Sequence, residues 1–228
     1  MKIEFVTKKK EKIKCLHQWP RPMKENQWQD GRSAKEMAKF AICHTEKFLN
    51  LIKRVLSECK IDEQDFECEP EAVAGLGKGM KSGGSRHHDI LMKGNSCVIG
   101  VEAKVSELFS EKNNIDIPRA LALWDFFCKE EKKEDEKIGY QLFTATRATM
   151  NSAVQLRNAI QLIIVFTGDV KKEPNYDDKY NKNEEAFNYF LEVTKAENGL
   201  IEREIDGKSV KCWIKKVKVR LPDYSFEK

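Results

Sequence analysis

The chain has 228 residues, of which 40% are hydrophobic and 34% are charged. This length can bury one sizeable core, and the apolar residues recur in periodic blocks, which argues against a disordered chain. Lysine and arginine (41) only slightly outnumber aspartate and glutamate (37), so the composition admits a polyanionic partner without requiring one.

The first strong helical signal runs from about Ala34 to Cys59. Ser33-Ala-Lys-Glu36 has the form of a capping box, in which each side chain satisfies a backbone amide at the start of a helix. A single long helix is therefore predicted here. Its apolar stripe, at three- and four-residue spacings, consists of Met37, Ala41, Phe48, Leu51, Ile52 and Val55.

Two strand-like segments follow, Asp89 to Met92 and Cys97 to Val105. The dipeptide Gly94-Asn95 between them suits a tight hairpin turn. Successive residues of a strand point to opposite faces, so Glu102 and Lys104 are predicted to emerge side by side on one surface.

Two short stretches before this hairpin are interpreted as irregular. Gly75 to Ser85 is rich in glycine and is interpreted as a loop. Glu69 and Glu71 flank Pro70 and are interpreted as a solvated turn, although either could donate a further carboxylate to a nearby site.

In the second half of the chain, helices alternate with strands. The nearly continuous apolar run Ile160 to Thr167 predicts a strand that is buried on both faces of a sheet. The other expected elements are a helix started by Asp116 and Pro118 and running through Phe127, a helix over 138–156, a loop over 171–182, a helix over 184–195, and a hairpin of 202–206 and 208–219 joined at Asp206-Gly207. The order indicates an α/β fold, a central mixed β-sheet flanked by helices, with a C-terminal β-hairpin appendage.

Seven cysteines form an odd set with no CxxC pair and no Cys/His spacing typical of zinc, so they are interpreted as thiols in a reducing cytoplasm. The N-terminal segment lacks the apolar core of a signal peptide, and the longest apolar run, Leu162 to Phe166, is too short to span a bilayer. We therefore expect a cytoplasmic protein with no membrane partner.

Asp89 and the triplet Glu102-Ala103-Lys104 are the strongest chemical signal. If Asp89 and Glu102 lie on the two arms of one hairpin, their carboxylates can converge on one hard divalent cation, for which Mg²⁺ is the natural candidate. The Lys104 ammonium can orient a water and stabilise negative charge on a phosphate, and the Ala103 carbonyl can add a backbone ligand. Such a site supplies what phosphodiester hydrolysis requires.

The pattern alone is weakly specific, because a chain rich in lysine and glutamate produces D-x(n)-E-x-K by chance. Its weight comes from three charges within an otherwise apolar pair of strands, where an unpaired charge is costly. A structural Glu102–Lys104 pair on an exposed edge strand, with Asp89 closing a turn, is an equally good interpretation of these residues alone.

Several segments resemble an uncharacterised bacterial family within the PD-(D/E)xK, or restriction-endonuclease-like, nuclease superfamily. They are GRSAKEMA, SGGSRHHDIL, VIGVEAKVSE, and YQLFTATRAT with LIIVFTG, and they cover about 28–197 in order. The VEAKVSE strand is the most diagnostic. The resemblance implies a restriction-endonuclease-like core that cuts nucleic acid with Mg²⁺ or Mn²⁺, using Asp89 and Glu102 as metal ligands and Lys104 as the catalytic lysine. One departure is that Arg86-His87-His88, rather than a residue pair Pro-Asp, leads into the hairpin.

The resemblance also implies two further site residues. Superfamily members often add a glutamine from the helix after the lysine strand, and Gln141 matches that position. They often add an acidic residue from the first helix; Glu46 is preferred to Glu36 as a metal ligand, because Glu36 is already explained by the capping box. A plain exposed helix charge is the simpler interpretation of either glutamate.

Three basic residues are expected to contact nucleic acid. His88 stands at the entrance of the first hairpin strand, and Arg147 follows Gln141 on the same predicted helix. Lys81 lies in the basic glycine-rich loop beside Asp89, which could close over a bound strand, although its spacing does not match a P-loop. For Arg147, an ordinary place in an amphipathic helix is equally plausible.

We thus expect a single domain over 1–228, with a core at about 28–197 and a β-hairpin extension at 198–228. The expected function is a metal-dependent nuclease that hydrolyses phosphodiester bonds of nucleic acid, with DNA preferred and restriction or defence as its setting; a homodimer is compatible. One alternative is a catalytically inactive nuclease-fold module that binds nucleic acid or a protein partner. Another is an α/β protein that acts on a small phosphorylated ligand.

Overall fold

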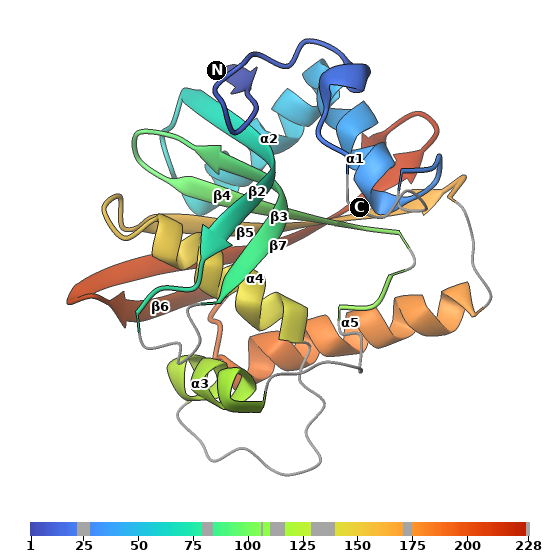
Figure 1. Ribbon diagram of the computed structural model, residues 1–228. Helices are drawn as coiled ribbons and strands as arrows, with labels where there is room; N and C mark the ends of the chain where they lie inside the picture. Colours follow the sequence, from blue (N-terminus) through green and yellow to red (C-terminus); the bar gives the residue numbers. More distant parts are fainter. Residues whose placement is uncertain are drawn as a thin grey trace.

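The computed structural model describes residues 1–21, 28–78, 84–105, 107–109, 117–128, 140–170 and 175–226. Within these residues, eight strands form one mixed sheet, and helices cover both of its faces (Figure 1). The fold is therefore α/β with a mixed central sheet flanked by helices, as the sequence predicts. None of the described helices has the length and hydrophobicity needed to cross a bilayer.

The sheet has the order β1-β2-β3-β4-β5-β7-β6, and β8 pairs with β7. The pairs β1/β2, β4/β5 and β5/β7 are parallel and the others are antiparallel. The strands are β1 (Lys2–Phe5), β2 (Asp65–Gly75), β3 (Ser85–Lys93), β4 (Val98–Lys104), β5 (Asn158–Gly168), β6 (Leu200–Ile205), β7 (Lys208–Leu221) and β8 (Ser225–Phe226). The helices are the 3-10 helix η1 (Leu16–Gln18), α1 (Ser33–Ile42), α2 (Thr45–Cys59), α3 (Ile117–Phe127), α4 (Tyr140–Ser152) and α5 (Tyr176–Val193).

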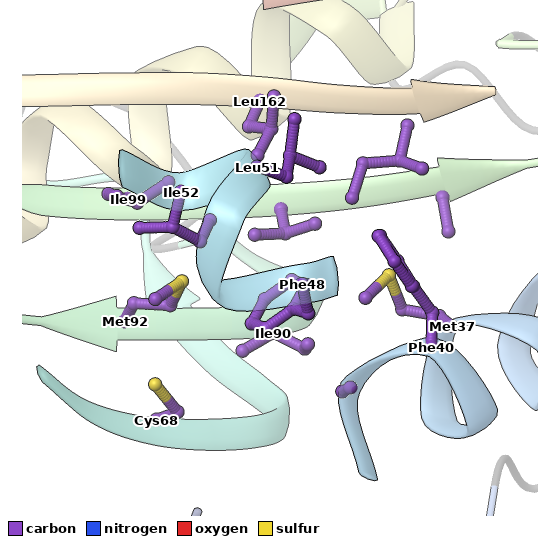
Figure 2. Packing of buried hydrophobic residues seen from close by; sticks show 14 of the residues in the cluster. Met37, Phe40, Phe48, Leu51, Ile52, Cys68, Ile90, Met92, Ile99 and Leu162 are labelled. Atoms are coloured by element: carbon purple, nitrogen blue, oxygen red, sulfur yellow. The ribbon is translucent and has the colours of Figure 1, made fainter. Parts of the chain in front are cut away.

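The helix predicted over 34–59 is in fact two helices, α1 and α2. The backbone of His44 leaves the helical region (φ −119°, ψ 40°), and the Thr45 hydroxyl donates to the carbonyls of Ala41 and Ile42 at the end of α1. Because of this break, each helix turns its own apolar stripe toward the sheet. Figure 2 shows the resulting contacts of α1 and α2 with the sheet, which involve Met37, Phe40, Phe48, Leu51, Ile52, Ile90, Met92, Ile99 and Leu162.

The opposite face of the sheet is covered by α4, with α3 and α5 packed outside it (Figure 1). Phe143 of α4 lies at the centre of this layer, with its ring centroid 5.5 Å from that of Phe127 and 4.8 Å from that of Phe190. These aromatic contacts pack α3 and α5 against α4, the helix that carries Gln141.

The predicted capping box does not form. The residue before α1 is Arg32, and the Ser33 hydroxyl donates instead to Glu107 Oε1 at 2.8 Å. The buried Glu36 carboxylate accepts the Gly31 N–H at 2.7 Å and the Tyr224 hydroxyl at 2.5 Å. Glu36 therefore holds the C-terminal turn against α1 rather than capping the helix.

Three other expectations about the fold are corrected. The C-terminal hairpin is no appendage, because β7 pairs with β5 in parallel from Asn158↔Lys211 to Gly168↔Leu221. The loop expected over 171–182 is helical from Tyr176, where Asp177 and Asp178 suit the first turn of α5. Glu69, Pro70 and Glu71, interpreted as a solvated turn, lie within strand β2. The expected helix start at Asp116 lies outside the described residues.

Candidate active site at the β3–β4 fork

The site is formed where β3 and β4 separate. Their antiparallel pairing ends at Ile90↔Val101; beyond it, β3 continues beside β2 and β4 continues beside β5. Asp89 and Glu102 are the first residues past this last pair, and Asp89 Oδ2 still accepts the Ala103 N–H at 2.7 Å. We call this point the β3–β4 fork. It brings the two carboxylates together at one end of the hairpin, which is the placement that the sequence predicts.

The strand β4 alternates as predicted. Val101 and Ala103 pack in the core below α1 and α2, whereas Val98 packs in the core below α4. Glu102 and Lys104 accordingly project toward α4.

The β3–β4 fork opens into a cavity of about 440 Å³. Its walls come from β2, β3, β4, the first turn of α1, α3, α4 and the segment 107–109. Among its lining residues, four carboxylates face three cations: Glu71, Asp89, Glu102 and Glu107, with Arg86, Lys104 and Arg119.

Glu102 is the most constrained of these carboxylates, with 3% of its surface exposed. Arg86 binds both of its oxygens, with Nη2 2.7 Å from Oε2 and Nε 3.3 Å from Oε1. Gln141 Nε2 donates to Oε2 at 3.2 Å. Burial alone would raise the pKa of Glu102, but Arg86, His88 and Lys104 outweigh it and lower that pKa to about 2. Glu102 is therefore ionised and held in place.

Asp89 and Glu71 behave in the opposite way. Burial and the charge of Glu102 raise the pKa of Asp89 to about 7, although Lys104 and the Ala103 N–H act against this. Burial and the charges of Asp89 and Glu102 raise the pKa of Glu71 to about 8. The cluster thus has more carboxylates than its cations neutralise, a condition that a bound divalent cation would relieve.

Glu71 reaches the cavity because β2 changes face at that residue. Phe66 and Cys68 pack on the α1–α2 side, whereas Ala72 and Ala74 pack on the α4 side. Even-numbered residues of a regular strand would share one face. Glu71 has a left-handed backbone (φ 50°), which accounts for the reversal.

Lys104 and Glu107 complete the cavity at the end of β4. Lys104 is 7% exposed, and its Nζ lies 5.8 Å from the centroid of the Phe109 ring. Burial raises the pKa of Glu107, but the Lys104 charge and the Val105 N–H produce a net lowering. Glu107 Oε2 accepts that N–H at 2.9 Å. Glu107 therefore fixes the chain just after the lysine strand.

The expected first-helix ligand and two of the expected nucleic-acid contacts are not where the sequence predicts. Glu46 is exposed on α2 and does not line the cavity, because the break at His44 separates its helix from α1. His88 is fully buried in the lining of the cavity, with Nδ1 3.5 Å from Glu102 Oε1, so it faces Glu102 rather than the protein surface. Arg147 is buried below α4, where it donates to the Leu76 carbonyl at 2.8 Å. Lys81 lies outside the described residues.

Sequence reasoning gave too little weight to two residues of the site. In the sequence Arg86 stands out only as part of the segment leading into Asp89, and its pairing with Glu102 depends on the separation of β3 and β4. The sequence around Pro70 favours a solvated turn for Glu71, which gives no sign that its side chain enters the cavity. The available signal was chemical: a buried glutamate such as Glu102 needs a cation nearby, and the basic Arg86-His87-His88 run precedes its strand partner.

The donor set of the cavity fits a hard cation. Carboxylate oxygens of Asp89 and Glu102, with Glu71 beside them, are the ligands that Mg²⁺ and Mn²⁺ prefer, and burial together with the charge of Glu102 raises the pKa values of Asp89 and Glu71. Within the described part of the chain, no three His, Cys, Asp or Glu side chains are placed to hold a metal ion. In this arrangement Arg86 occupies both oxygens of Glu102.

Comparison with known proteins identifies a family but no individual relative. Neither the curated proteins nor the solved structures contain a match to the chain. A family model described as "Domain of unknown function (DUF6946)" matches residues 12–220, which include every strand of the sheet except β1 and β8 and end one residue before β7 does. The chain therefore belongs to the DUF6946 family.

Proposed function

We propose that this protein is a metal-dependent nuclease with a restriction-endonuclease-like core, hydrolysing phosphodiester bonds of nucleic acid, with DNA as the expected substrate. The observation that carries the proposal is the β3–β4 fork, from which Asp89, Glu102 and Lys104 enter one cavity. The mixed sheet with helices on both faces is compatible with the PD-(D/E)xK superfamily that the sequence resembles.

In this proposal Asp89 and Glu102 hold the cation, with the Ala103 carbonyl as a backbone ligand. A bound Mg²⁺ supplies a water of lowered pKa and neutralises charge at the scissile phosphate. The Lys104 ammonium, on the same face of β4 as Glu102, donates hydrogen bonds to the attacking water and to a phosphate oxygen. Gln141 keeps the Glu102 carboxylate in its orientation through the 3.2 Å hydrogen bond.

The test is cleavage of duplex DNA, single-stranded DNA and RNA in Mg²⁺ or Mn²⁺ by the wild type and by Asp89→Asn and Lys104→Met. Each substitution should lower the cleavage rate at least about a hundredfold, the usual effect of removing one group that stabilises the transition state. Glu46→Gln is the matched control, because it removes an exposed acidic charge outside the cavity and should cut like the wild type. Equal cutting by all four proteins would refute the proposal.

One observation favours a second candidate, a nuclease fold that binds nucleic acid or a protein partner without cutting. Arg86 already neutralises Glu102 through two hydrogen bonds, as expected of a site that no longer takes a metal. Salt-sensitive nucleic-acid binding without hydrolysis in any divalent cation would support this candidate. The presence of Asp89, Glu102 and Lys104 together favours the enzyme.

A further inference from the structure

We propose that Arg86 and the divalent cation compete for Glu102, so that the guanidinium must leave the carboxylate before the site can take its metal. This inference rests on the proposed function, because it concerns the loading of the same site.

The hydrogen bonds of Glu102 leave little capacity for a further ligand. Arg86 takes both carboxylate oxygens, at 2.7 and 3.3 Å, and Gln141 shares Oε2 at 3.2 Å. A carboxylate engaged by a bidentate guanidinium cannot offer the same lone pairs to a cation. One of the two partners has to give way.

Arg86 is the partner that can move. Its side chain is 25% exposed and lines the cavity, whereas the side chain of Glu102 is 3% exposed and is also held by Gln141 on α4. An incoming divalent cation carries twice the charge of the guanidinium. It would also interact with Asp89 and Glu71, neither of which forms an ion pair within the described residues.

The displaced guanidinium would stay at the cavity wall. Arg86 belongs to β3, and β3 remains paired with β2 up to Gly75↔Ser85, so its backbone does not need to move. A bound cation repels the guanidinium and neutralises the carboxylates that had held it. Arg86 can then bind an anion such as a phosphodiester. Arg86 therefore restrains the metal-free site and becomes available to the substrate once the metal has entered.

The experiment measures Mn²⁺ binding to metal-free protein without nucleic acid, by the loss of the free-ion EPR signal and by calorimetry. Arg86→Gln should bind Mn²⁺ at least about tenfold more tightly than the wild type, within the 5–150-fold range typical of coupling between two binding events. Arg86→Lys should fall between them, because an ammonium cannot form the paired hydrogen bonds. Arg119→Gln is the control, since it removes the same charge from another wall of the cavity and should change the affinity less than about threefold.

Equal or weaker Mn²⁺ binding by Arg86→Gln would overturn the inference, and so would a gain of the same size in Arg119→Gln, because that result indicates a general field effect. If Arg86→Gln does not fold, the comparison passes to Arg86→Lys, and an unchanged affinity in that variant overturns the inference. The cleavage assay separates the two proposals. If the protein cleaves nucleic acid but wild type and Arg86→Gln bind Mn²⁺ equally well, the proposed nuclease function stands and the competition between Arg86 and the cation is refuted. If Arg86→Gln binds Mn²⁺ more tightly but no cleavage occurs, the competition stands and the nuclease function is refuted.

Discussion

Asp89 Oδ2 accepts the Ala103 N–H at 2.7 Å, and the two residues lie one and two positions beyond the last ladder pair of β3 and β4. This bond keeps the two strands together at the β3–β4 fork, although their pairing has ended. It also sets a requirement for mutagenesis. Asp89→Asn keeps a side-chain oxygen for the amide and removes only the charge, whereas Asp89→Ala leaves a backbone donor without its partner.

The first prediction concerns stability against pH in metal-free buffer. The pKa of Asp89 is about 7 when folded, against an ordinary 3.8, and that of Glu71 is about 8, against 4.5. At a pH between the ordinary pKa of each group and its raised pKa in the folded state, the folded protein binds more protons than the unfolded chain. The free energy of unfolding therefore falls as the pH rises from about 5 to about 8. Asp89→Asn and Glu71→Gln should each melt higher than the wild type at pH 8, by on the order of 1 kcal/mol or about 2–4 °C in Tm.

Thermal unfolding followed by circular dichroism at pH 5, 6.5 and 8 tests this prediction. The difference between variant and wild type is the informative quantity, because His44, whose pKa is lowered by burial, acts in the opposite direction. Glu69→Gln, on the same strand but outside the cavity, should leave the pH dependence unchanged. A difference between Asp89→Asn and wild type that does not grow with pH would contradict the assignment of excess charge to the β3–β4 fork.

The second prediction concerns Gln141. Its amide donates to Glu102 Oε2, so Gln141→Leu removes one of the contacts that orient the carboxylate. Cleavage should fall roughly 10–100-fold, as for other groups that orient metal ligands. Thr144→Val is the matched control on the cavity face of α4, because among the described residues the Thr144 hydroxyl donates only to the carbonyls of Tyr140 and Gln141 in its own helix. Full activity of Gln141→Leu would remove this residue from the site.

The parts of the fold that depend on local pattern were predictable. Gly94-Asn95 marks the turn of the β3–β4 hairpin, and strand alternation places Glu102 and Lys104 on one face. The apolar run of β5 indicates a strand buried on both faces. In each case the signal lies within a dozen neighbouring residues, so no distant contact is needed to interpret it.

Features of the fold that depend on contacts between residues far apart in the sequence could not be predicted from the local pattern. Pro70 and the left-handed Glu71 interrupt the alternation of β2, which is held as a strand by β1 and β3 on either side. The position of β7 beside β5 is a parallel pairing across a long crossover, and the local hairpin pattern is the same with or without it. Glu102 and Lys104, on a regularly alternating strand, are therefore predictable from the sequence, whereas the roles of Glu71 and Arg86 depend on these distant contacts.

The third prediction concerns Gly100, at the centre of β4. A Cβ at this position would lie 2.1 Å from Thr149 Oγ1 and 3.0 Å from His88 Cε1. Both neighbours are fully buried and cannot withdraw into solvent. Gly100→Ala should therefore lower the free energy of unfolding by roughly 1–3 kcal/mol in chemical denaturation.

A second substitution that removes Thr149 Oγ1 tests whether this steric clash causes the loss of stability. Gly100→Ala combined with Thr149→Ala should cost less than the sum of the two single changes, by at least about 0.5 kcal/mol, because the second change removes the nearest atom. Gly75→Ala is the control, since no atom of the described residues lies within 4 Å of its added Cβ. Strict additivity in the double variant would contradict the close packing of α4 on β4.

The fourth prediction separates Arg147 from the proposed nucleic-acid surface. Arg147 is 4% exposed; its guanidinium lies 3.9 Å from the centroid of the Phe126 ring and donates to the Leu76 carbonyl. Arg147→Met should cost about 2 kcal/mol of unfolding free energy, from the lost cation–π contact and hydrogen bond, with nucleic-acid affinity per folded molecule unchanged. Arg119→Gln, at the cavity wall, should weaken that affinity and its salt dependence instead. If Arg147→Met keeps wild-type stability but loses nucleic-acid binding, Arg147 belongs to the binding surface after all, and α4 would have to present a second face to the substrate.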